Sequence, residues 1–93
     1  MAVSVEVRLP TLLRAEAGGA ASVSANGTTV RQVFAEITAA HPGLSSNLVD
    51  GDGNLHKFVN VYRNDEDIRY LDALDTEVAD GDVISILPAV AGG

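Results

Sequence analysis

The groups best suited to chemistry are the two glycines that end the chain, Gly92 and Gly93. Gly93 carries the α-carboxylate, and neither glycine has a side chain that would hinder close approach to it. A strand-like run at residues 83–87 stops at Pro88, so we expect residues 88–93 to form a flexible tail. Six extended residues reach roughly 20 Å, enough to enter a narrow channel in another protein. The alternative is an ordinary frayed terminus.

On the first interpretation the Gly93 carboxylate is the reactive group, delivered into the active site of a partner. The three preceding residues, Val90, Ala91 and Gly92, would lie in the channel that leads to that active site.

Two histidines and an acidic loop are the other candidates for chemistry, and each lacks the partners it would need. His41 follows a predicted helix, and His56 has no second histidine or carboxylate at ligand spacing. Residues 50–54 resemble the start of a calcium loop. A calcium loop needs glycine at its sixth position and glutamate at its twelfth, where this chain has Leu55 and Val61. We predict no metal site.

The composition excludes several functional classes. The chain has no cysteine, hence no thiol nucleophile or disulfide, and it has no nucleophile-elbow serine or phosphate-binding glycine loop. We therefore do not expect an enzyme, and we expect no cofactor to be bound by the chain itself. Its net charge of −7 argues against nucleic acid and anionic membranes and favours a basic partner surface. With no signal-like or membrane-spanning apolar run, a cytoplasmic location is expected.

The N-terminal half reads as two strands followed by a helix. Apolar and polar residues alternate over residues 2–9, which indicates a half-buried strand, and a weaker alternation at 21–24 predicts its hairpin partner. We expect a loop at residues 11–19 between them. Thr29 and Gln32 fit a capping box, and apolar spacing predicts a helix over residues 30–40 that stops before Pro42. A short turn that covers the core edge should follow, with Leu44 and Leu48.

The C-terminal half reads as strands joined by polar turns. Residues 58–63 form a strand, residues 64–67 an acidic turn, and Ile68 can start a short strand. Leu71 and Leu74 are expected to anchor the connection that follows. The Asp80-Gly81-Asp82 turn leads into the last strand, in which Ile84 and Ile86 share one face.

This order of elements predicts an α+β fold of the β-grasp, or ubiquitin-like, type. A mixed sheet of four to five strands would be crossed by one main helix, with the first and last strands adjacent in its middle. We expect one domain, residues 1–87, and the tail 88–93. If Ile84 and Ile86 face the core, Leu87 faces solvent beside the tail. With Phe58 and Tyr62 it would form a patch that docks a partner.

Several segments resemble one known family. They read DGDVISILP at residues 80–88, LHKFVNVY at 55–62, NDED at 64–67 and ILPAVAGG at 86–93. In these segments the chain resembles the ubiquitin-like sulfur carriers of the MoaD/ThiS family, and within it the carriers of cysteine biosynthesis. In that family the position of Leu87 contacts the partner and that of Val90 anchors the tail. Carriers for molybdopterin tend to have an aromatic residue where this chain has Leu87.

The resemblance implies a cycle carried out by partner enzymes. An adenylating enzyme would use ATP to activate the Gly93 carboxylate, and a sulfur donor would convert it to a thiocarboxylate. A pyridoxal-phosphate-dependent cysteine synthase would accept the sulfur on an activated serine, and a zinc peptidase would release the product from the tail. Alternative acceptors would make molybdopterin, thiamine or a specialised sulfur-containing metabolite. A ubiquitin-like protein modifier and a β-grasp interaction module without tail chemistry are the remaining alternatives.

Overall fold

The structure is a computed structural model of the 93-residue chain, and it describes residues 3–49, 56 and 59–88. Three sequence predictions lie outside the described residues. They concern the loop at 50–54, Phe58 as a docking residue, and the tail residues Val90, Ala91, Gly92 and Gly93.

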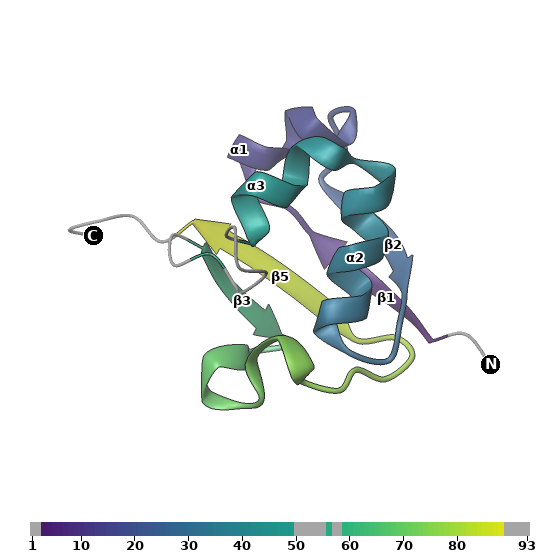
Figure 1. Cartoon of the computed structure of the whole chain (residues 1–93), viewed down its shortest axis with the longest axis vertical. Helices are drawn as coiled ribbons and strands as arrows, with labels where there is room; N and C mark the ends of the chain where they lie inside the picture. The colour runs from purple at the N-terminus through teal and green to yellow at the C-terminus, as the bar shows by residue number, and fades with distance from the viewer. Residues whose placement is uncertain (1–2, 50–55, 57–58, 89–93) are drawn as a thin grey trace.

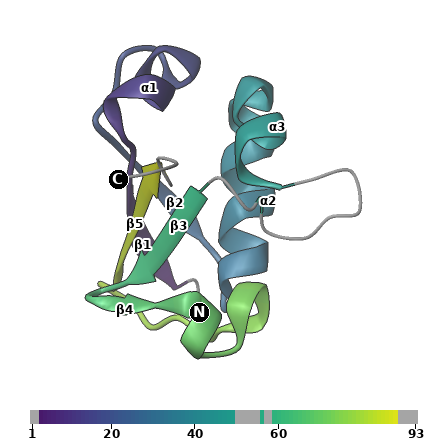
Figure 2. The same ribbon diagram turned by 90° about the vertical axis from the view of Figure 1, so that its left-hand side faces the viewer.

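The sheet has five strands in the order β2-β1-β5-β3-β4 (Figures 1 and 2). β1 and β5 are parallel neighbours in the middle, and the other three pairings are antiparallel. The predicted hairpin and the predicted contact between the first and last strands are confirmed, and the fold is the β-grasp. The strands are β1 (Ser4–Arg8), β2 (Ser22–Asn26), β3 (Val59–Arg63), β4 (Glu66–Asp67) and β5 (Val83–Pro88).

Helix α2 (Val30–Ala40) has the predicted bounds and covers one side of the sheet (Figure 2). The Thr29 hydroxyl accepts a hydrogen bond from the Gln32 backbone N–H at 3.2 Å, as the capping box predicts. The reciprocal bond differs, because the Gln32 side-chain oxygen accepts from the N–H of Thr28, one residue earlier. Apolar residues of the helix and of the alternating strands meet in one core, which includes Val5, Val7, Val33, Phe34, Ile37, Ile84 and Ile86.

The predicted loop at residues 11–19 is wrong, because most of it is helical. Helix α1 (Thr11–Arg14) continues into a 3₁₀ turn (Ala15–Ala17), which ends at Gly18 with a positive φ of 69°. Leu13 and Ala17 lie four residues apart and are both buried, so tertiary packing stabilises these two short turns. A single helical turn has too little intrinsic stability to be evident from its sequence.

The segment after β3 also differs from the prediction. Ile68 does not start a strand: it begins a 3₁₀ turn (Ile68–Tyr70), and the short strand lies just before it. The Asp67 carboxylate accepts a hydrogen bond from the Arg69 N–H at 2.9 Å, which favours the turn over an extended chain. Leu74 is buried as predicted, but Leu71 is 38% exposed and is not an anchor.

A second short helical segment closes the core beside α2. A 3₁₀ turn (Pro42–Leu44) runs into helix α3 (Ser45–Leu48), and Leu44 and Leu48 are fully buried, as predicted. Within the described residues no helix has the length and apolar character needed to cross a membrane.

Candidate docking surface at the end of strand β5

Strand β5 brings the chain to the start of the tail from the centre of the sheet. It lies between β1 and β3, and its last pairings join Leu87 to Asn60 and Pro88 to Val59. Strand β5 thus includes Pro88, one residue past the expected end of the domain. β1 pairs with β5 only as far as Ser85, so the last residues of β5 are held in the sheet by β3.

Side chains of β5 alternate as the sequence predicts. Ile84 and Ile86 are buried, whereas Leu87 is 48% exposed. Leu87 is thus a large apolar side chain left accessible at the end of β5.

Tyr62 lies close to Leu87 on the sheet face that carries Leu87. Tyr62 pairs with Ser85 in the register of β3 and β5, two residues before Leu87. Tyr62, Ser85 and Leu87 line one open hollow of about 270 Å³, together with Asn64 and Asp65 of the β3–β4 turn. Two members of the predicted patch are thus brought together. Its third member, Phe58, is outside the described residues.

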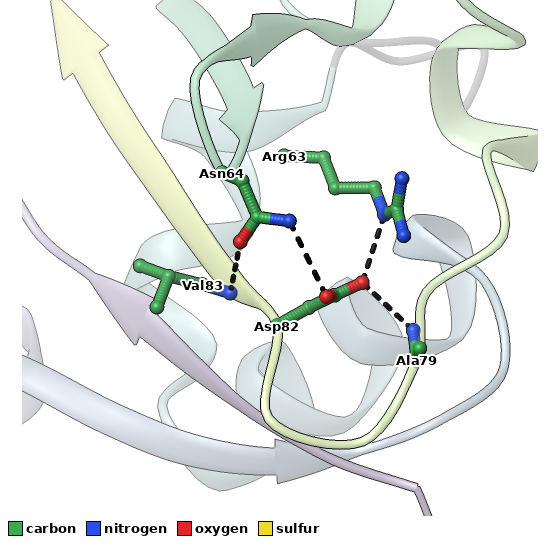
Figure 3. Close-up of polar contacts among 5 residues, drawn as sticks. All are labelled: Arg63, Asn64, Ala79, Asp82 and Val83. Carbon is green, nitrogen blue, oxygen red and sulfur yellow. Dashed lines mark hydrogen bonds and ion pairs between the residues drawn. The ribbon is translucent and has the colours of Figure 1, made fainter.

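A polar cluster holds the start of β5 to the end of β3 (Figure 3). The Asp82 carboxylate accepts hydrogen bonds from Arg63 Nε at 2.8 Å, from the Ala79 N–H at 2.8 Å and from Asn64 Nδ2 at 3.3 Å. Asn64 Oδ1 in turn accepts from the Val83 N–H at 3.1 Å. The cluster thereby ties the turn before β5 to the β3–β4 turn that contributes to the hollow.

The same cluster shifts the titration of Asp82. Burial by itself would raise the pKa of this carboxyl group. The bonds from Ala79, Arg63 and Asn64, with the positive charge of Arg63, outweigh burial and hold the pKa below its ordinary value of 3.8. Asp82 is therefore a carboxylate at neutral pH, and its role is to position β5. The turn that contains Asp82 is evident in the sequence, but its hydrogen-bond partners are not.

Both histidines take part in backbone hydrogen bonds. The His41 N–H donates to the Ile37 carbonyl oxygen at the end of α2, and the His56 N–H donates to the Leu48 carbonyl oxygen. In the part of the chain that the structure describes, no three histidine, cysteine, aspartate or glutamate side chains group as metal ligands.

Comparisons with known proteins identify relatives of this chain. The model described as the ThiS family matches residues 7–93. The sulfur carrier protein CysO of Mycobacterium tuberculosis is 50% identical over 93 residues, covering 98% of this chain and 100% of that protein. A chain in the crystal structure of the Amycolatopsis orientalis BexX/CysO complex has a TM-score of 0.89 and 48% identity, covering 96% of this chain and 99% of that one. Small archaeal modifier protein 3 of Haloferax volcanii is 38% identical over 65 residues, 70% of each chain.

Proposed function

Because the chain belongs to the ThiS family, as its C-terminal segments predict, we propose that it is a sulfur carrier protein whose cargo is bound at the Gly93 carboxylate. The observation that carries the proposal is the end of β5. A strand fixed in the middle of the sheet presents an exposed Leu87 directly before the Gly-Gly tail. The chain then acts as a protein co-substrate of its partners and not as a catalyst.

The proposed chemistry needs little from the carrier itself. A carboxylate is a poor electrophile, so an oxygen of Gly93 first attacks the α-phosphate of ATP and displaces pyrophosphate. The resulting acyl-adenylate loses AMP when hydrosulfide from a sulfur donor attacks the carbonyl carbon; the sulfur then loses its proton, and the thiocarboxylate remains on the tail. The carrier supplies an accessible carboxyl group and a surface for recognition, while ATP binds to the adenylating enzyme.

The final product that receives the sulfur is, in this proposal, cysteine. The support for cysteine is the 50% identity to CysO over nearly the whole of both chains. The acceptor would be an activated serine on a pyridoxal-phosphate-dependent synthase, and a zinc peptidase would then release cysteine from the tail. Pyridoxal phosphate and zinc would belong to those two enzymes. Carriers for molybdopterin, thiamine or a specialised metabolite remain the alternative within sulfur transfer.

A second candidate function is attachment of Gly93 to lysines of other proteins. The observation that favours it is the 38% identity to an archaeal modifier protein. The protein has a single lysine, Lys57, so one copy offers little to which the Gly93 carboxylate of another copy could be attached. This candidate shares the adenylation step and differs in what attacks the activated carbonyl carbon.

Deletion of Gly93 tests whether the tail is the functional group. ATP–pyrophosphate exchange by the adenylating enzyme from the same organism should require the intact tail and disappear in the deletion variant. A β-grasp module without tail chemistry would bind its partners equally well after the deletion. Exchange that persists without Gly93 would contradict the proposal.

A further inference from the structure

A second open hollow, of about 570 Å³, adjoins the end of β5. It lies between β5 and the segment that runs from the end of β1 into α1, because β1 and β5 are parallel and Arg8 pairs with Ser85. Ser85 and Leu87 line both this hollow and the one beside Tyr62. The two hollows therefore form one continuous surface around Leu87. We call the second one the α1 hollow.

The α1 hollow is apolar because of how α1 is anchored. Leu13 and Ala17 point into the core and are buried, and successive residues of a helix are turned by about 100°. Leu12 is consequently directed outward and is 75% exposed. Leu12 and Leu87 are two of the four large apolar side chains that are exposed among the described residues, and both line this hollow.

The α1 hollow is also cationic, in contrast to the chain as a whole. The net charge is −7, yet two of the six basic residues, Arg8 and Arg14, line the hollow and no acidic residue does. Arg8 forms an exposed ion pair with Glu6 at 2.7 Å. Such a pair contributes little to stability, so Arg8 can exchange Glu6 for a carboxylate of a partner. Arg14 Nε donates to the Leu9 carbonyl oxygen at 3.2 Å, and Arg14 has no ion pair among the described residues.

We propose that the α1 hollow receives an acidic segment, with an apolar side chain for Leu12 and Leu87, from the enzyme that adenylates Gly93. The inference rests on the proposed function, since an enzyme that takes up the tail must cover the surface around Leu87. The distribution of charge on the carrier is the reason for choosing an acidic segment as the occupant. The acidic remainder of the carrier suits a basic partner surface, and the apolar, cationic hollow at the end of β5 suits an acidic element within it. Such a mixed pattern fixes the orientation of docking and discriminates between partners.

Two substitutions and two matched controls test this inference. Arg8→Glu reverses a charge at the hollow, and Leu12→Asp places a carboxylate where the acidic segment would lie. Arg31→Glu is the control for the first, because Arg31 also belongs to an exposed ion pair, with Asp75, and lies outside the α1 hollow. Leu71→Asp is the control for the second, as an exposed leucine outside the α1 hollow. Each control makes the same change in net charge as its test variant.

The readout is ATP–pyrophosphate exchange with the adenylating enzyme, measured against carrier concentration. We expect Arg8→Glu and Leu12→Asp each to raise KM for the carrier about tenfold, equivalent to about 1.4 kcal/mol, with kcat retained. The controls should stay within about twofold of the unmodified chain, and thermal unfolding should show all four variants folded.

Unchanged KM values for both test variants would overturn the inference while leaving the proposed function intact. Equal losses in tests and controls would do the same, because they would trace the effect to net charge alone. Normal adenylation with impaired transfer to the acceptor synthase would assign the hollow to a different enzyme. An unmodified carrier that supports no exchange would contradict the proposed function, and this inference with it.

Discussion

Removal of the Asp82 carboxylate should weaken the attachment of β5 at its start. In Asp82→Ala the Arg63 guanidinium, the Ala79 N–H and the Asn64 amide all lose the acceptor that they share. The Asp82 side chain is 13% exposed and that of Arg63 is 30% exposed, so water replaces the lost carboxylate only in part.

The size of the effect follows from the charge and burial of this cluster. Hydrogen bonds to a charged group contribute roughly 1.5–3 kcal/mol, and partial access of water to Arg63 places the expected loss at about 2 kcal/mol. For a domain of this length, 1 kcal/mol corresponds to roughly 4–8 °C in Tm, so Tm should fall by about 8–16 °C.

Thermal unfolding followed by circular dichroism at pH 7 measures this loss. The matched control is Asp80→Ala in the same turn, which removes one exposed hydrogen bond, from the Ser4 N–H at 3.0 Å. Because that bond is exposed and water can replace the lost acceptor, the control should cost no more than about 1 kcal/mol. If Asp82→Ala unfolded at the same temperature as Asp80→Ala, the cluster would not hold β5 as described.

Three further predictions concern pH, the cap of α2 and docking. The folded-state pKa of Asp82 lies below its ordinary 3.8, so its stabilisation is complete above that value and is lost as pH falls through the folded-state pKa; the Tm difference between the unmodified chain and Asp82→Ala should be constant from pH 7 to about pH 5 and shrink below about pH 4. Thr29→Ala should cost about 1 kcal/mol through loss of the N-cap, whereas Thr38→Ala, whose hydroxyl bonds back to the Phe34 carbonyl oxygen, should leave Tm nearly unchanged; equal Tm changes would refute the capping role. Leu87→Asp should weaken binding to the adenylating enzyme at least about tenfold with the fold intact, because a charge buried in an interface is costly; unchanged activation kinetics would remove Leu87 from the docking surface.

The sequence was most informative where local signals agreed. Helix α2 begins after Thr29 and ends before Pro42, and a cap, an apolar periodicity and a proline all point to those bounds. Alternation in the last strand predicted that Ile86 is buried and Leu87 exposed, since neighbouring residues of a strand face opposite sides. These features predicted the fold and the direction of Leu87.

What could not be predicted depends on contacts between distant residues. Helix α1 is a single turn held by burial of Leu13, so the α1 hollow and the outward direction of Leu12 become evident only in the folded chain. Arg63 and Asp82 are 19 positions apart and meet because of the register of β3 against β5. A turn motif alone carries no information about that register.

The central claim is that Gly93 carries sulfur, and the mass of the intact chain tests it most directly. After incubation with ATP, the adenylating enzyme from the same organism and a sulfur source, the account predicts a mass increase equal to the replacement of one oxygen by sulfur. The chain that lacks Gly93 should keep its original mass. A chain with an intact tail that is adenylated but never gains this mass with any such sulfur source would contradict the account.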